Sequence, residues 1–331
     1  MVRLDHVNRI LVDQGLARLR AGRGHPGVNA LFRVAGRDVG RASASDLGFV
    51  AGPRLNAAGR LADMSLGIRC LLADSDAEAE PLARELDRLN RERREIETSM
   101  QDEALAQADA TLAHDDQYTL CAYRAQWHPG VVGIVASRLK DRYHRPVVVF
   151  ADGDAGELRG SGRSIEGFHL RDAFDLVAKR EPATILRFGG HAYAAGLSIR
   201  AEALSRFAEA FERVAREALS EAALRRERES DGELAQGELT IDLARALTAR
   251  VWGQGFAPPA FDDVFDVAEQ RVVGDGHAKL RLVRAGESFA AIAFRTPCAL
   301  PHRVHALYRP EVRQWNGLDS LELVVDFWRP A

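Results

Sequence analysis

A polar run at residues 225–232, with the sequence RRERESDG, divides this chain into two parts with different apolar patterns. The residues before the run alternate between helical and buried-strand patterns, which is typical of a mixed α/β domain. The residues after it form a series of short strand-like segments. Because the run has no apolar periodicity of its own, it predicts a linker. A chain of 331 residues is also long for one compact domain.

The segment 115–224 carries the α/β pattern. Buried-strand patterns occur at 118–125, 146–151, 158–164 and 195–199, and helical patterns at 130–143, 170–179 and 201–219. The segment 231–331 carries five strand-like segments, at 261–269, 277–283, 288–294, 304–309 and 320–327. Turns rich in Gly and Asn separate these five. So many short strands in about 100 residues favour a small barrel, with an OB-fold as the natural candidate.

Residues 74–114 predict a long connector helix. Apolar residues such as Leu82, Leu86 and Leu89 recur at roughly helical spacing among dense charges. A helix with so much charge is usually a solvated connection between domains, and Pro81 makes its first turn uncertain. Residues 1–73 predict short helices and loops, too small and irregular to hold a core alone. We expect this helical segment to expose apolar surface.

Composition excludes several classes of protein. The chain is 46% hydrophobic and 28% charged, which is ordinary for a globular protein. No apolar run approaches the roughly 18–20 residues that a bilayer span needs, and the N-terminus has no secretory pattern. The cysteines Cys70, Cys121 and Cys298 lie far apart, without a zinc-ligand spacing. We therefore expect a cytoplasmic protein without a structural zinc. The net charge of −3 does not by itself indicate a nucleic-acid binder.

The first of three chemistry-bearing motifs is GPRLNAAGRL at 52–61. Its small residues at 57–59 permit close backbone approach, and Arg54, Asn56 and Arg60 supply donors that suit phosphate oxygens. An ordinary helix-packing turn with solvated arginines fits the same pattern.

The second motif is RGSGRS at 159–164, at the end of a predicted strand. Two glycines flank Ser161 and precede Arg163, an arrangement that suits a backbone nest for an anion. A glycine-rich bulge is the alternative. The third motif, FGGHAYAAG at 188–196, places Gly189 and Gly190 before His191. It fits a ligand contact, although a lone histidine usually has a structural role.

These motifs, in this order and with WHPGVVGIVASRL at 127–139, resemble the RecJ family of the DHH phosphoesterase superfamily. The resemblance covers essentially the whole chain. The helix at 82–97 is similar to the family's interdomain connector, and the segment from Trp252 onward to its OB domain. The resemblance implies a DHH-associated α/β domain followed by the barrel.

The implied activity is 5'→3' exonucleolytic hydrolysis of single-stranded DNA, in DNA repair and recombination. Arg60, Ser161 and Arg163 match positions that cradle the 5'-phosphate or line the nucleotide channel, and the motif around His191 matches one that faces the catalytic cleft. The barrel would hold the following strand by charge and base stacking. Candidates for stacking are Tyr308 and Trp315, which could equally be packed at the edge of a barrel strand.

The chain departs from the family in lacking the Asp-His-His motif, since Asp5-His6 has neither its place nor its second histidine. The intact family enzyme uses two Mn²⁺ or Mg²⁺ ions. We expect no catalytic metal pair in this chain, and a DNA binder that is inactive alone. Our hypothesis is that the sequence starts at an internal methionine.

The expected partners are single-stranded DNA and, by resemblance, single-strand-binding protein and repair helicases. Two alternatives are a DHH phosphoesterase of oligoribonucleotides or cyclic dinucleotides, and a non-catalytic nucleic-acid-binding scaffold. The barrel argues against the phosphoesterase, since a short substrate needs no strand-holding module.

Overall fold

The computed structural model describes residues 4–114, 117–274, 276–296, 299–315 and 317–331. The backbone forms two compact units. The α/β unit comprises Pro26–Ala35 and Ala51–Glu227, and the barrel unit comprises the residues up to His25, Gly36–Val50 and the chain from Arg228 onward.

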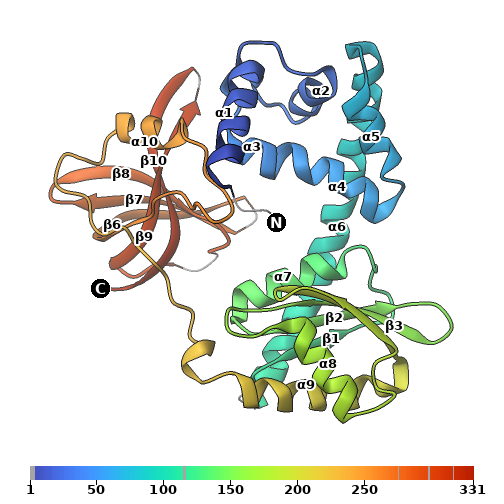
Figure 1. The fold of residues 1–331 in the computed structure, drawn as a ribbon. Helices are drawn as coiled ribbons and strands as arrows, with labels where there is room; N and C mark the ends of the chain where they lie inside the picture. Colours follow the sequence, from blue (N-terminus) through green and yellow to red (C-terminus); the bar gives the residue numbers. More distant parts are fainter. Residues whose placement is uncertain (1–3, 115–116, 275, 297–298, 316) are drawn as a thin grey trace. The chain divides into compact units, whose positions relative to one another are not determined.

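The α/β unit contains a five-stranded mixed sheet in the order β1-β2-β3-β5-β4 (Figure 1). Its strands are β1 (Leu120–Tyr123), β2 (Val147–Asp152), β3 (Glu157–Arg163), β4 (Arg187–Gly190) and β5 (Ala194–Arg200). The β1–β2 pair is parallel and the other pairs are antiparallel. β4 was not predicted, because a strand ending in Gly-Gly lacks the apolar alternation that identifies strands.

Helices cover the two faces of this sheet with separate cores. The helices are α6 (Asp76–His114), α7 (Val132–Tyr143), α8 (Leu170–Arg180) and α9 (Leu204–Ala218). Successive side chains of a strand point to opposite faces. Val147 and Val149 of β2 therefore pack with α6 and α7, while Val148 and Phe150 pack with α8 and α9. This packing confirms the predicted mixed α/β fold.

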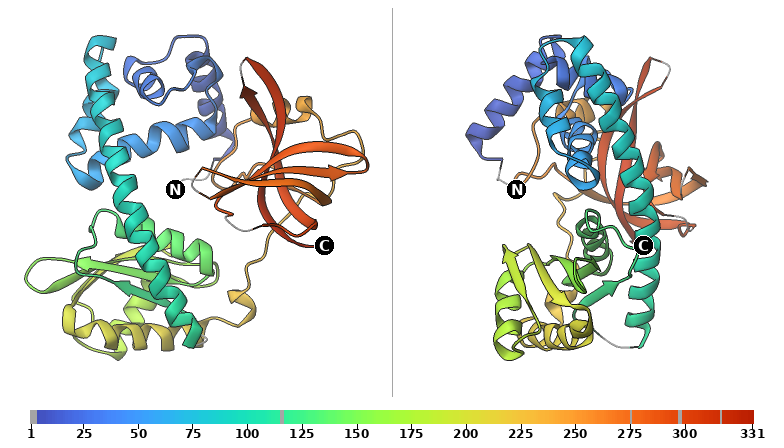
Figure 2. Two further views of the ribbon diagram at one scale, coloured as in Figure 1. Left: turned by 180° about the vertical axis from the view of Figure 1, so that it is seen from behind. Right: turned by 90° about the vertical axis from the view of Figure 1, so that its right-hand side faces the viewer.

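The helix α6 runs from the α/β domain to a group of shorter helices in the same unit (Figure 2). These are α2 (Pro26–Val34), α4 (Gly52–Leu61) and α5 (Ser65–Leu72). The predicted long helix is present, and one stripe of it is not solvated, because Asn90, Arg93 and Glu97 are buried. Glu97 ion-pairs with Arg93 and also with Arg138 of α7. These contacts give one stripe of α6 a packing role.

The barrel unit confirms the predicted small barrel. Five strands close in the order β10-β8-β7-β6-β9. They are β6 (Phe261–Val273), β7 (His277–Arg284), β8 (Glu287–Ala293), β9 (Arg303–Trp315) and β10 (Leu318–Pro330). β10 pairs parallel with β8 and antiparallel with β9. β6, β9 and β10 are longer than expected, because their antiparallel ladders continue through residues without strict apolar alternation.

The barrel unit also contains α1 (His6–Arg20), α3 (Ala44–Asp46), α10 (Ile241–Thr248) and the single turn Val39–Arg41. A further turn, Leu47–Ala51, ends at the first residue of the α/β unit. The segment before β6 anchors the start of the chain. Leu4 donates a backbone hydrogen bond of 2.8 Å to Gln254, and the Arg9 guanidinium lies 3.7 Å from the ring centroid of Phe256. This is a cation–π contact.

Several large apolar side chains are exposed in residues 4–73, as expected from the sequence. The exposed fractions are 66% for Leu11, 77% for Phe49 and 70% for Leu72. In the described part of the chain, no helix has both the length and the apolar character to cross a bilayer.

Candidate nucleic-acid interface

Strand register gathers the second and third motifs at one end of the α/β sheet. Arg163, the last residue of β3, pairs with Ala194, the first residue of β5. The next residue, Ser164, donates a backbone hydrogen bond of 3.0 Å to Tyr193. His191 is exposed, and its backbone N–H donates to the carbonyl oxygen of Ala194 at 2.8 Å. The arginine, at the end of β3, and the histidine, in the turn between β4 and β5, therefore lie at the same end of the sheet.

Gly190 can only be glycine in this turn. Its φ is +140°, and a Cβ there would lie 2.5 Å from the carbonyl oxygen of Ala194. Gly189 differs, because its Cβ position has no atom within 4 Å. The turn therefore requires glycine at position 190, whereas Gly189 is an exposed strand residue with open space where a side chain would be.

The first motif contacts the WHPG loop before α7. The Arg60 guanidinium donates a hydrogen bond of 2.9 Å to the carbonyl oxygen of Gly130. The Gly130 N–H in turn donates to Nδ1 of His128 at 3.0 Å. Arg60 is thereby fixed against the start of α7. Sequence reasoning assigned no role to His128 or Gly130, although they lie in a segment that carried the family resemblance.

Arg163 is held at the same place from the sheet side. It donates to the Ser161 hydroxyl at 3.0 Å and to the Gly162 carbonyl at 2.7 Å. A Cβ on Gly133, the second residue of α7, would lie 2.9 Å from both the Arg163 Nη2 and the Ser161 Oγ. The helix has no side-chain N-cap. The positive end of its dipole therefore lies beside Arg163.

Electrostatics favours an anion at this point. Burial lowers the pKa of Arg163, and the positive charge of nearby Arg60 lowers that pKa further. Within the described residues, no ion pair joins either guanidinium to a carboxylate. Two like charges held by neutral oxygens leave N–H donors for a phosphate group, which guanidinium binds by charge-assisted hydrogen bonds.

The three donors predicted from the first motif lie on two different faces of α4. Asn56 is exposed, and it shares a face of α4 with Arg60 at i,i+4 spacing. Arg54 lies on the opposite, buried face, where its Nη2 is 2.9 Å from Oδ1 of Asp87 in α6. The burial of Arg54 and its pairing with Asp87 argue against the predicted contact with DNA.

The stacking prediction for Tyr308 is wrong. Its side chain is fully buried in the barrel core, and its hydroxyl donates to buried Asp263 at 2.6 Å. Burial and this hydrogen bond raise the pKa of Tyr308. The side chain of Trp315 lies outside the described residues, so its predicted role stays a prediction.

An aromatic pair that sequence reasoning missed is exposed on the barrel. The rings of His277 and Phe294 meet edge to face with centroids 5.2 Å apart, and Phe294 is 54% exposed. The outward positions Ala290 and Ile292 of β8 continue to Phe294. This alternation was visible in the sequence.

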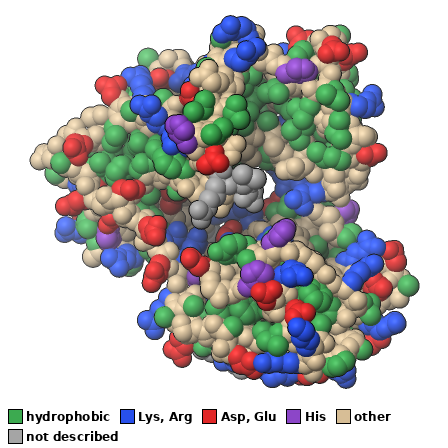
Figure 3. Space-filling model, in the orientation of Figure 1, with side chains coloured by type: hydrophobic (Ala, Val, Ile, Leu, Met, Phe, Trp, Pro, Cys, Tyr) green, Lys and Arg blue, Asp and Glu red, His purple; other side chains and the backbone are tan. Residues whose placement is uncertain are grey.

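Figure 3 shows Lys and Arg interspersed with Asp and Glu on the drawn face, rather than gathered in one basic patch.

Metal ligands are a separate matter. No group of three or more His, Cys, Asp or Glu side chains in the described ranges is arranged to hold a metal ion. The interface around Arg60 and Arg163 does not fit a divalent cation, because the charged groups of this interface are guanidinium ions.

Two domain families match this chain. Residues 116–217 match the DHHA1 domain, and residues 230–326 match the RecJ OB domain. Since the first match covers the sheet with Arg163 and the second covers the closed barrel, the matches agree with the observed architecture.

Relatives named single-stranded-DNA-specific exonuclease RecJ match nearly all of this chain. The chain is 45% identical to the single-stranded-DNA-specific exonuclease RecJ of Escherichia coli K12, with 98% of this chain and 58% of that protein covered. It is 42% identical to the protein of the same name from Haemophilus influenzae, covering 100% and 60%. The chain thus spans less than two thirds of the length of these relatives.

Solved structures give the same result. The crystal structure of RecJ in complex with Mg²⁺ from Thermus thermophilus matches with a TM-score of 0.82 and 30% identity, over 100% of this chain and 50% of that one. An exonuclease RecJ bound to manganese matches with a TM-score of 0.53 and 34% identity, over 64% and 51%.

Proposed function

Because this chain belongs to the RecJ family, we propose that it holds the 5'-phosphorylated end of single-stranded DNA for 5'→3' exonucleolytic hydrolysis in DNA repair and recombination. The observation that carries the proposal is the pair of guanidinium groups, Arg60 and Arg163, which lack a carboxylate partner among the described residues. A terminal phosphate carries more negative charge than a phosphodiester. It therefore gains more from two adjacent arginines and a helix N-terminus.

Ser161 positions Arg163 by accepting its hydrogen bond, and Gly133 leaves the space in which both side chains lie. The exposed side chains of Asn56 and His191 supply further hydrogen-bond donors to the DNA in this proposal. In this proposal Gly190 shapes the turn that presents His191. The work of these residues is to bind and orient the strand end, which lowers the entropic cost of reaction.

The barrel would hold the strand beyond its 5' end. Base stacking on aromatic side chains is tolerant of sequence. The exposed His277–Phe294 pair supports this role better than buried Tyr308. Single-strand-binding protein and repair helicases, as partners in the cytoplasm, remain predictions.

Divalent metal would supply the activated water and neutralise charge during hydrolysis. Two similar structures contain Mg²⁺ or Mn²⁺. Since the described residues of this chain do not fit such an ion, we assign them no step of bond cleavage. The alternatives of a small-substrate phosphoesterase and a scaffold are not favoured, because the named relatives match along the whole chain, barrel included.

The test compares fluorescence anisotropy of 5'-phosphorylated and 5'-hydroxyl oligonucleotides. We expect the protein to prefer the phosphorylated end. Arg163→Ala should reduce that preference by about 1–3 kcal/mol, the scale of a lost charge-assisted hydrogen bond. Arg213→Ala is the matched control, since Arg213 is an exposed arginine of α9 paired with Glu181. If Arg163→Ala lowered the affinity for both oligonucleotides equally, that result would contradict a 5'-phosphate site.

A further inference from the structure

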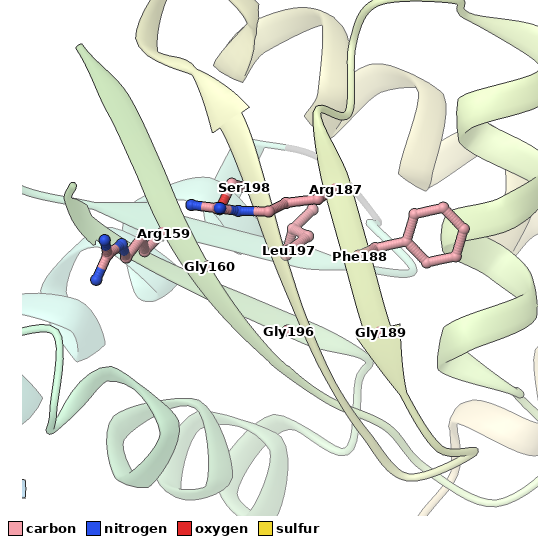
Figure 4. A pocket seen from close by; sticks show the side chains of 8 residues that line it. All are labelled: Arg159, Gly160, Arg187, Phe188, Gly189, Gly196, Leu197 and Ser198. Carbon is pink, nitrogen blue, oxygen red and sulfur yellow. The ribbon is translucent and has the colours of Figure 1, made fainter. Parts of the chain in front are cut away.

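Beside the 5'-phosphate site, part of the α/β sheet on the α7 side has no helix over it, and Gly189 and Gly196 are exposed there. Helix α7 packs against β3 on this side, and β5 and β4 continue the sheet beyond it. A shallow pocket lies on this open part (Figure 4). Its lining includes Arg159, Arg187, Gly189, Gly196 and Ser198.

Strand register orders the face into two rows across β3, β5 and β4. One row is Ser161, Gly196 and Gly189, and the next is Arg159, Ser198 and Arg187. Figure 4 shows the Arg187 side chain extending from β4 across β5 toward β3, whereas Phe188 points away toward the helices. The first row begins at Ser161, so the pocket continues directly from the 5'-phosphate site.

The floor of the pocket is bare backbone. A Cβ on Gly189 would meet no atom within 4 Å, and one on Gly196 would lie 3.7 Å from its nearest neighbour, the Gly160 carbonyl oxygen. Neither position has a positive φ. Their glycines are therefore not required by backbone conformation, and the absence of side chains leaves room for a ligand to approach the strands.

The two arginines are available to an anion. Arg159 pairs with Asp154 at 2.5 Å, and Arg187 pairs with Glu157 at 3.2 Å. The side chains of Arg159 and Arg187 are 50% and 67% exposed. Exposed ion pairs of this kind contribute little free energy. A phosphate group can therefore replace the carboxylates, and Ser198, which accepts from Arg187 Nε at 3.1 Å, orients that guanidinium.

We propose that this pocket binds an internucleotide phosphodiester of the strand whose 5' end lies at Arg60 and Arg163. The inference rests on the proposed function and adds a second anion subsite, formed by Arg159 and Arg187. Arg163 follows Arg159 by four positions along β3, which corresponds to about 13 Å of extended strand. That span exceeds the distance between neighbouring phosphates of one strand, so it leaves room for two nucleosides over the glycine floor between the two bound phosphate groups.

The salt dependence of DNA binding tests the proposal. Each phosphate that a protein neutralises on a single strand adds about 0.7 to the slope of log K against log salt concentration. The double variant Arg159→Ala/Arg187→Ala should lower that slope by about 0.7 and weaken affinity for a 5'-phosphorylated oligonucleotide at least about tenfold. Its preference for the 5'-phosphate should persist, because Arg60 and Arg163 are unchanged.

The matched control is Arg180→Ala/Arg213→Ala, which removes the same charge and likewise leaves two carboxylates, Glu217 and Glu181, unpaired. It should leave the salt slope unchanged. An equal slope change in both double variants would overturn the proposal by reducing it to net charge. The Arg159→Ala/Arg187→Ala variant could instead keep the salt slope of the unmodified protein and still prefer the 5'-phosphate. That result would overturn this subsite alone. Absence of any 5'-phosphate preference in the unmodified protein would overturn the proposed function instead.

Gly189→Val provides an independent test of the floor. A β-branched residue suits a strand, and the added side chain enters open space. We expect unchanged thermal stability with DNA affinity lowered at least about tenfold. Unaltered affinity in this variant would show that no ligand occupies the floor and would overturn the proposal.

Discussion

The Arg60 guanidinium donates a 2.9 Å hydrogen bond to the carbonyl oxygen of Gly130, seventy positions away in the chain. The backbones of the two residues are also close together, because a Cβ on Gly130 would lie only 2.2 Å from the Arg60 carbonyl oxygen. The end of α4 and the loop before α7 therefore approach backbone to backbone. This approach brings Arg60 close enough to Arg163 for their charges to interact.

Gly130→Ala should separate α4 from α7. The added methyl group cannot fit against backbone, so we expect a loss of about 1–3 kcal/mol of unfolding free energy, as for other overpacked sites. The 5'-phosphate preference should fall as well, because Arg60 moves. Urea denaturation and anisotropy measure the two effects. Gly15→Ala, where a Cβ in α1 meets nothing within 4 Å, should be neutral or slightly stabilising. An unchanged stability in Gly130→Ala would argue against the close approach.

Glu97→Gln should destabilise the α/β unit. Burial lowers the pKa of Arg93, and the Glu97 charge opposes that shift. Removing the charge leaves Arg93 buried without compensation and breaks the link to Arg138. We expect a loss of roughly 3–5 kcal/mol in urea denaturation. The control Glu95→Gln changes an exposed glutamate of the same helix and should stay within about 0.5 kcal/mol. Similar stabilities for the two variants would contradict the buried network.

Tyr308→Phe and Phe294→Ala should have opposite consequences. Loss of the Tyr308 hydroxyl removes a hydrogen bond to buried Asp263, which should lower stability by about 1.5–3 kcal/mol and leave DNA affinity unchanged. Loss of exposed Phe294 should weaken single-strand binding by about 1–3 kcal/mol with little change in stability. Thermal unfolding and anisotropy separate these effects. Weaker binding by Tyr308→Phe alone would reverse our assignment.

Acid should weaken the barrel through Asp262. Hydrogen bonds from Ser230 and then from His305 lower the pKa of this carboxyl below its usual 3.8. A depressed pKa in the folded state means that the stabilisation is present above about pH 4 and is lost as the pH falls through the folded value. Asp262→Asn should therefore flatten the fall in urea midpoint below pH 4. Asp242→Asn, at an exposed site of α10, should leave that fall intact. Parallel curves for all three proteins would contradict the prediction.

Local patterns in the sequence predicted the α/β sheet, the long helix and the barrel, because periodicity of apolar residues reports which face of an element is buried. The three motifs also indicated phosphate chemistry, since arginine, serine and glycine have that capacity wherever they occur. The division into four segments and the predicted DNA contacts other than that of Tyr308 remain predictions.

Only the tertiary structure decided which of these groups can act. Arg54 and Arg60 lie on one short helix, yet one is paired with Asp87 and the other faces Gly130. Tyr308 is aromatic in a strand, but the barrel closes over it. Residue type sets the chemistry that a side chain can perform. Its solvent exposure and neighbours depend on contacts between distant segments, which no local pattern encodes.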